Sequence, residues 1–356
     1  MSKLVRITGI LLGLVLAGAA NAAQVADLYQ ADVVAEGSTA QWQQQALAQV
    51  LVRVSGKADV VTQPDIAAEL KRASGYVKQF EAVRHADGNR MRVLLDAVKV
   101  NQLLQQHNIA VWGELRPDIL IWLVQQDGAE RRFVRQTEHA LNTGLQQAFR
   151  QAALPLLRPL YDMDDLLNIA ETDVWAGFWQ QINKASQRYV ADVVVAVTVA
   201  QVNTDAGSQL RLTWQRQSDG KTYRDEVTAT DEAALMHAFA AGLAGQLSER
   251  YASVMSASGN ATLLLKVQGL HSLAELVQVQ KLLQQMVGVT QVTISRYQAG
   301  VAHYTINSSV AADSFLNALR FNKQLRPVAP AAESVVTEPL NATEPPVLAT
   351  FEFISR

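Results

Sequence analysis

The spacing of apolar residues changes several times along the chain, and it divides the first part into strands and helices. Residues 25–34 are rich in apolar residues and predict a strand at the start of this part of the chain. From Ser38 to Gly56 the apolar residues recur at every fourth position, which predicts a helix with one buried face. Two alternating runs separated by an Asp-Gly turn predict a hairpin between residues 76 and 98. We assign these elements to an N-terminal α/β domain at residues 23–115.

A second domain is predicted at residues 116–255, after the Arg-Pro pair that ends the first. A continuous apolar run at residues 118–124 predicts a buried strand, and residues 191–202, 209–215 and 222–228 predict three more. Helices are predicted at residues 137–151 and 173–188. A long closing helix carries an apolar residue at every fourth position, namely Leu235, Phe239, Leu243, Leu247 and Tyr251. The pattern indicates an α+β domain with helices packed against a mixed sheet. By resemblance at the level of the fold alone, it looks like the amino-terminal domains of periplasmic assembly factors such as the Tol-system translocation protein.

A third domain is predicted at residues 260–325, where the elements follow in the order β-α-β-β-α, which resembles a ferredoxin-like module. Residues 326–347 are rich in Pro, Ala, Glu and Thr, a composition typical of a flexible linker. Residues 348–356 carry Phe351 and Phe353 on one face, which predicts a docked edge strand. The whole pattern predicts a multi-domain α+β fold, with helices packed on mixed or antiparallel sheets.

The first 22 residues have the layout of a secretory signal peptide. Lys3 and Arg6 precede an apolar run at residues 7–17, and the small-residue triplet Ala20-Asn21-Ala22 follows, so cleavage is predicted before Ala23. The run is shorter than the roughly 20 residues that a membrane-spanning helix needs, and no membrane span is expected after cleavage. The chain has no cysteine, which excludes disulfides and a cysteine-linked lipid anchor.

Charge and motifs exclude several classes of function. The net charge of −2 is carried by dispersed basic residues, which argues against a nucleic-acid partner. The densest basic group is Arg131, Arg132 and Arg135, which we interpret as a solvated loop at a helix start. The six histidines show no metal-binding spacing, and no nucleophile elbow, phosphate-binding loop or dinucleotide-binding motif occurs. We therefore predict no metal, no cofactor and no catalytic activity.

One acidic cluster follows a proline-pinned segment and is the first candidate site. Asp162, Asp164 and Asp165 place three carboxylates within four residues. They could bind a hard cation such as calcium, or one of them could act as a general base if its neighbours raised its pKa. The structural alternative is that Asp162 caps a helix whose first turn holds the other two, where the helix dipole favours negative charge.

An aromatic group close behind is the second candidate site. Trp175 and Trp179 lie beside Phe178, and Phe178 shares a helical face with Ile182 in the helix predicted at residues 173–188. The stripe indicates core packing, but one tryptophan must point away from it. A partly exposed tryptophan could anchor a protein partner or line a ligand groove, because tryptophan is enriched where binding energy concentrates. The alternative for both is packing in the core or between domains.

Three stretches of the chain resemble a known family: residues 154–165 (LPLLRPLYDMDD), residues 173–177 (DVWAG) and residues 185–192 (ASQRYVAD). Together with the end of the first predicted helix, at residues 46–56, and the third domain, these stretches are similar to the proteobacterial family called domain of unknown function 2066. The resemblance implies an exported protein of the Gram-negative envelope, located in the periplasm. That family has no assigned activity, so the resemblance implies no catalytic residue.

The sequence therefore predicts a periplasmic protein that holds one or more envelope protein partners and does not catalyse a reaction. The sheets would offer free edges for strand addition. The alternative is a binding protein for a small molecule or cell-wall fragment, held in a groove between the first two domains. A third reading is an enzyme that uses Asp162, Asp164 or Asp165.

Overall fold

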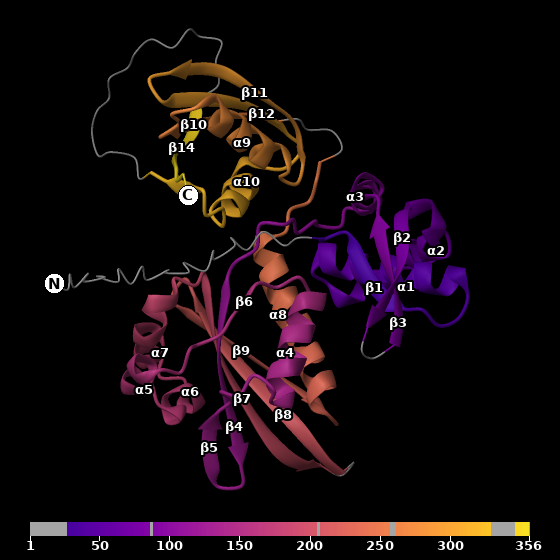
Figure 1. The fold of residues 1–356 in the computed structure, drawn as a ribbon, viewed down its shortest axis with the longest axis vertical. Coiled ribbons are helices and arrows are strands. Elements are labelled where there is room, and N and C mark those ends of the chain that lie inside the picture. Colours follow the sequence, from indigo (N-terminus) through magenta and orange to yellow (C-terminus); the bar gives the residue numbers. More distant parts are fainter. Residues whose placement is uncertain (1–26, 86–87, 205–206, 257–260, 329–345, 356) are drawn as a thin grey trace, which may run out of the picture.

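The computed structural model describes residues 27–85, 88–204, 207–256, 261–328 and 346–355 (Figure 1). The predicted signal peptide and cleavage site lie outside these residues. The described chain forms three sheets, one in each successive part of the sequence, and helices pack against them. This arrangement confirms the predicted α+β fold with several mixed or antiparallel sheets. We refer to residues 27–113, 114–255 and 261–355 as the first, second and third units.

The first unit is a three-stranded antiparallel sheet with the strand order β1-β3-β2. Helix α1 packs against it with the apolar stripe that the sequence predicts, and its N-cap Ser38 forms the predicted capping box with Gln41. The helix ends at Gly56, whose φ of 72° is readily adopted only by glycine. The elements are β1 (Gln30–Val34), α1 (Thr39–Ser55), α2 (Pro64–Leu70), β2 (Val77–His85), β3 (Gly88–Leu95) and α3 (Ala97–Gln106).

The second unit is built on a six-stranded mixed sheet with the order β5-β4-β7-β8-β9, and β6 also pairs with β4. Strand β4 runs parallel to β6 and β7, and the remaining pairs are antiparallel. The strands are β4 (Ile119–Asp127), β5 (Glu130–Phe133), β6 (Leu156–Leu157), β7 (Val193–Thr204), β8 (Gly207–Ser218) and β9 (Lys221–Ala229).

Helices cover both faces of this sheet, and β4 is buried between them (Figure 1). Ile119, Ile121 and Leu123 face a core with α4 (Ala140–Gln151) and α8 (Glu232–Tyr251). Leu120 and Trp122 face a smaller core with α6 (Glu171–Ala176) and α7 (Trp179–Ser186), and α5 (Met163–Asn168) packs against α7. The continuous apolar run of β4 follows from this burial on both faces.

The prediction of one continuous helix at residues 173–188 is wrong, because two helices occupy this stretch. Gly177 has a φ of 71° and ends α6, and Phe178 then acts as the N-cap of α7. Ile182 is fully buried as expected, but Phe178 is 54% exposed. The stripe fails at Phe178 because this residue is the N-cap of α7 and has a non-helical ψ of 82°, so its side chain does not follow the helical face that Ile182 shares.

The third unit is a five-stranded sheet with the order β11-β12-β10-β14-β13. Its elements follow the predicted β-α-β-β-α order through β10 (Ala261–Gln268), α9 (Leu273–Gln284), β11 (Val289–Gln298), β12 (Val301–Ser308) and α10 (Ala312–Leu319). Two strands follow, β13 (Leu325–Pro327) and β14 (Val347–Phe353). Most of the predicted linker, residues 329–345, lies outside the described residues, but its start belongs to β13.

Strand β14 is an inner strand, and the predicted position at the sheet edge is wrong. It pairs in parallel with β10 and antiparallel with β13. Phe351 and Phe353 both face the core, as their spacing predicts. An inner strand forms backbone hydrogen bonds with two neighbouring strands, whereas an edge strand forms them with one. The inner position of β14 therefore satisfies more backbone N–H and C=O groups.

The three units contact one another around the segments that join them. Val111 forms a β-bridge with Ser253, and the rings of Tyr251 and Phe321 lie 4.9 Å apart. The first and third units share one continuous apolar core through Val111 and Met255. None of the described helices is both long and apolar enough to cross a membrane.

Candidate functional site

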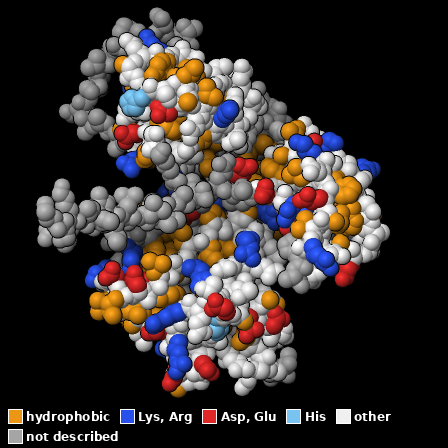
Figure 2. All heavy atoms as spheres, viewed as in Figure 1, with side chains coloured by type: hydrophobic (Ala, Val, Ile, Leu, Met, Phe, Trp, Pro, Cys, Tyr) orange, Lys and Arg blue, Asp and Glu red, His pale blue; other side chains and the backbone are white. Residues whose placement is uncertain are grey.

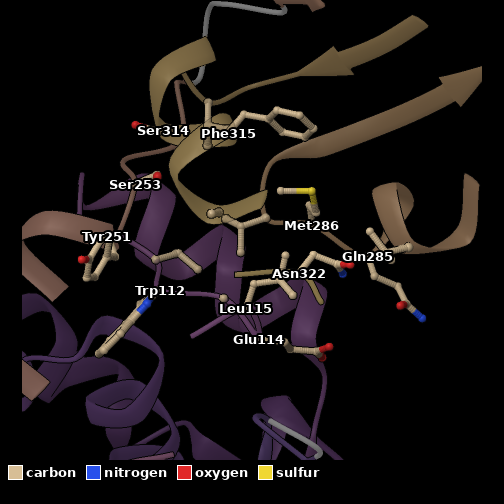
Figure 3. Close-up of a pocket in the computed structure, with 16 residues that line it drawn as sticks. Trp112, Glu114, Leu115, Tyr251, Ser253, Gln285, Met286, Ser314, Phe315 and Asn322 are labelled. Carbon is tan, nitrogen blue, oxygen red and sulfur yellow. The ribbon is translucent and has the colours of Figure 1, made fainter. Parts of the chain in front are cut away.

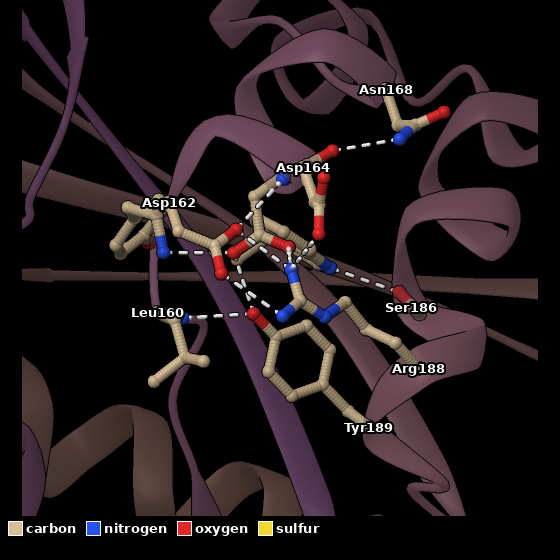
Figure 4. A network of polar contacts seen from close by, with 10 residues as sticks. Leu160, Asp162, Asp164, Asn168, Ser186, Arg188 and Tyr189 are labelled. Carbon is tan, nitrogen blue, oxygen red and sulfur yellow. Dashed lines mark hydrogen bonds and ion pairs between the residues drawn. The ribbon is translucent and has the colours of Figure 1, made fainter.

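The predicted acidic cluster forms a closed polar network with Arg188 and Tyr189, which the sequence analysis did not select (Figure 4). Asp162 is the N-cap of α5, and its Oδ1 accepts a hydrogen bond from the backbone N–H of Asp165 at 3.1 Å. The predicted capping role is confirmed. Arg188 binds both carboxylate oxygens of Asp162, at 2.7 and 2.9 Å. These charged hydrogen bonds hold the pKa of Asp162 below its ordinary value.

Asp165 lies at the buried centre of this network. Its Oδ2 accepts hydrogen bonds from the Tyr161 backbone N–H at 2.8 Å and from the Tyr189 hydroxyl at 2.5 Å. Its Oδ1 lies 3.3 Å from Nη1 of Arg188. Burial, reinforced by the hydrogen bond to Asp165, raises the pKa of Tyr189 to about 12. The tyrosine therefore remains a proton donor at neutral pH and keeps Asp165 satisfied.

Asp164 is the outermost member of the cluster, with a side chain that is 79% exposed. Its carboxylate lies 3.9 Å from Nη1 of Arg188, so one guanidinium faces all three aspartates. In the described part of the chain, no group of three or more His, Asp or Glu side chains is arranged to hold a metal ion. The geometry shows what the carboxylates do here: they cap α5 and anchor it to the end of α7.

The two predicted tryptophans lie on the same side of the sheet and both pack against its smaller core. The ring of Trp175 is covered by the guanidinium of Arg131, which lies 4.3 Å from the ring centroid. Trp179 is partly exposed, and its indole N–H is buried without a hydrogen-bond partner among the described residues. Neither ring projects freely into solvent, so the apolar surface of this region comes from other residues.

Aliphatic side chains that the sequence analysis missed provide this surface. On α5, Met163 is 70% exposed and Leu167 is 75% exposed, and their four-residue spacing puts them on one face. Apolar atoms gather over α5 at the lower left of the molecule (Figure 2). We call this group the α5 surface; it consists of Leu160, Met163, Leu166 and Leu167. Two further exposed apolar residues, Phe178 and Val190, lie in the same stretch of sequence.

The signal that could have identified the α5 surface is the length of the helix. Asp162 starts α5 and residues 169–170 separate it from α6, so only six residues are helical. The inward face of a six-residue helix is small, and in α5 Asp165 occupies it. Met163, Leu166 and Leu167 therefore face solvent. The pattern of apolar residues alone would assign these leucines to the hydrophobic core.

The junction of the three units encloses a small cavity (Figure 3). Trp112, Ser253, Met286 and Phe315 are among the residues that line it, and its volume is about 50 Å³. The indole N–H of Trp112 is buried there without a partner among the described residues. Pockets for small ligands typically measure about 300–1,000 Å³. This cavity is smaller than that range.

Comparisons with known proteins find a family match for only part of the chain. The model of a family described as "Domain of unknown function (DUF8605)" matches residues 22–113, which is the first unit. This match overturns the predicted membership of domain of unknown function 2066. The residues behind that resemblance include a helix N-cap and a glycine that ends a helix, features that unrelated helices share. No curated protein and no solved structure matches the chain.

Proposed function

We propose that this chain is an exported periplasmic protein of the cell envelope that acts without catalysis, by holding a protein partner on the α5 surface. The proposal rests on the exposure of Leu160, Met163 and Leu167 within a few residues of one another. Exposed apolar groups of this kind mark interaction sites, because their contact with water is unfavourable until a partner covers them. Export is supported by the layout of residues 1–22.

The charge around the α5 surface indicates which partner fits. Asp162, Asp164 and Asp165 bring three carboxylates to α5, and among the residues that the structure describes Arg188 forms ion pairs with all three. The local field is therefore negative, and Asp164 faces solvent. A partner segment with apolar side chains flanked by Lys or Arg would match both properties, whereas an anionic lipid surface would be repelled.

The network beneath the surface supports binding because it holds α5 in place before a partner arrives. Arg188 and Tyr189 fix Asp162 and Asp165 through hydrogen bonds of 2.5 to 3.3 Å. A surface that is already ordered loses less conformational entropy when it is covered. The polar network can therefore keep the leucines of α5 in position although the helix has only six residues.

The test places a photo-crosslinking amino acid at Leu167 in cells and identifies the crosslinked peptide by mass spectrometry. The matched control places it at Val98 on α3, which is also well exposed, at 65%, but lies in the first unit. We expect a protein adduct at position 167 that is absent at position 98, joined to a partner segment containing Lys or Arg beside apolar residues. The adduct should weaken on Met163→Glu.

Three outcomes would count against the proposal. They are equal adducts at positions 167 and 98, an adduct at 167 that consists only of lipid, and an adduct that Met163→Glu leaves unchanged. Export is tested separately by cell fractionation and N-terminal sequencing, where we expect a mature protein that begins at Ala23 in the periplasm. Full-length chain in the cytosol would refute the proposed location without bearing on the α5 surface.

A further inference from the structure

A second pocket lies on the second unit, at the carboxyl end of strand β4, and the proposed function does not use it. Its volume is about 460 Å³, within the range of small-ligand sites. At this end β4 turns into the antiparallel strand β5, and residues of both strands line the pocket. The pocket is lined by Gln125, Asp127, Arg132, Phe133, Val134, Arg135, Gln136, His139 and Glu171.

The pocket brings charged groups of both signs together. Arg132 and Arg135 contribute two guanidinium groups, and Asp127 and Glu171 contribute two carboxylates. Arg135 lies 3.6 Å from Glu171, and Arg132 pairs with Glu130. The Arg132–Glu130 pair is largely exposed, whereas the Arg135–Glu171 pair is partly exposed and its N–O distance of 3.6 Å is longer than a hydrogen bond. Each pair engages only Nη2 of a guanidinium that carries five N–H donors. A ligand can therefore bind to either guanidinium without breaking a strong interaction.

His139 adds a directed donor to the cationic part of the pocket. It is the N-cap of the twelve-residue helix α4, and its Nδ1 accepts a hydrogen bond from the Leu141 backbone N–H at 3.2 Å. The neutral imidazole then carries its proton on Nε2, which is a donor. The positive end of the α4 dipole lies in the same place. These groups act together with the two arginines in favour of an anionic ligand group.

The loop that carries Arg135 is held by a buried side chain. Asn142 is 2% exposed, and its amide nitrogen donates to the backbone carbonyls of Val134 and Gln136, at 3.0 and 2.6 Å. Val134 also donates its backbone N–H to Leu123 at 3.0 Å. The backbone on both sides of Arg135 is therefore fixed, which a binding site needs if its charged groups are to keep their spacing.

We infer that this pocket binds a small zwitterion of the short-peptide class, with the ligand carboxylate on Arg132, Arg135 and His139 and its ammonium on Asp127 and Glu171. The balance of two cations and two anions favours a ligand with both charges over one with either charge alone. Guanidinium groups suit a carboxylate because their N–H donors match its two oxygens. The site is separate from the α5 surface and can be tested independently of it.

The test measures binding of tri-alanine to the full chain by titration calorimetry, with N-acetyl-tri-alanine amide as the uncharged comparison. Arg135→Gln should weaken tri-alanine binding by about tenfold or more, as expected for the loss of a charged hydrogen bond. Arg131→Gln is the matched control, because Arg131 is a close neighbour that stacks on Trp175 and does not line the pocket. Asp127→Asn should weaken binding through the ammonium.

The inference fails under any of four results: no heat of binding at millimolar tri-alanine, equal binding of the uncharged peptide, equal effects of Arg135→Gln and Arg131→Gln, or no effect of Asp127→Asn. Both arginines are exposed, so the variants should fold, and matching melting temperatures would verify this. If Arg135→Gln lowers the melting temperature, comparing the two peptides on the wild-type chain still decides the result.

Discussion

Arg116 shows how one residue can hold two units of the chain together. Its guanidinium is 1% exposed and makes five hydrogen bonds to carbonyl oxygens. One of these carbonyls belongs to Arg53 in the last turn of α1, and two belong to Ala152 and Ala153, just after α4. Carbonyls at helix ends lack partners within the helix, and a cation there is favoured by the dipole. Burial lowers the pKa of Arg116 to about 9, so it stays charged at neutral pH.

Replacing Arg116 with Met should lower the free energy of unfolding by about 3–5 kcal/mol, because several buried carbonyls lose their donor at once. The measurement is chemical denaturation. The exposed Arg224→Met on β9 is the control, and its effect should stay within about 0.5 kcal/mol. Equal effects of the two changes would show that the guanidinium does not hold the junction.

Asp162→Asn separates the charge of the cap from its hydrogen bond, because asparagine is also a good N-cap. The pKa of Asp162 is lowered in the folded state, so its charge stabilises the fold above the ordinary value of 3.8 and this contribution disappears as the pH falls below it. We expect the variant to melt below the wild type at pH 7, and this difference in melting temperature to shrink as the pH is lowered to 3. A difference in melting temperature that is the same at both pH values would contradict this account.

Among the elements, β14 shows most clearly how non-local pairing decides a structure. It has seven residues and pairs with β10 on one side and with β13 on the other. Gly269 approaches it closely: a Cβ there would lie 3.1 Å from the carbonyl oxygen of Phe353. The sequence predicts which face of this strand is buried, but its partners in β10 lie 83–84 positions away and its partners in β13 lie 24–28 positions away.

Phe351→Ala should therefore destabilise the protein by about 3 kcal/mol or more, the usual cost of removing a buried phenylalanine ring. Phe351 is 3% exposed, and the neighbouring Glu352 points to solvent. Glu352→Ala is the control and should be nearly neutral. The measurement compares the denaturation midpoints of the two variants. A Phe351→Ala midpoint as high as that of the control would mean that β14 contributes little to the stability of the third unit.

At the scale of the whole molecule, the units are joined by buried contacts. The shared core of the first and third units passes through Val111 and Met255, and Lys323 of the third unit pairs with the buried Asp118 of the second. At Gly56, a Cβ would lie 2.3 Å from the Cβ of Ser248, so the end of α1 packs closely against the side chain of Ser248 on α8. Such interfaces couple the unfolding of the parts they join.

We expect the full chain to unfold in a single calorimetric transition for this reason. Differential scanning calorimetry, compared with circular dichroism and tryptophan fluorescence, is the measurement. Coincident transitions would support coupling of the units, whereas separate transitions would show that the junction contributes little to stability.

The sequence by itself determined the local elements, because their causes are local. The capping box at Ser38, the cap at Asp162, the stripe of α8 and the alternating face of β14 all depend on spacings of two to four residues. The α+β class followed from these elements.

Only the tertiary structure decided what the candidate residues do. It paired Asp162 and Asp165 with an arginine and a tyrosine more than 20 residues away, and it left the leucines of α5 exposed because nothing covers that face in the described chain. It also placed Arg132 and Arg135 beside Glu171 in one pocket. The physical reason is that burial and charge pairing depend on which surfaces meet in space, and hydrophobic periodicity records which face of an element is apolar but not what that face will meet.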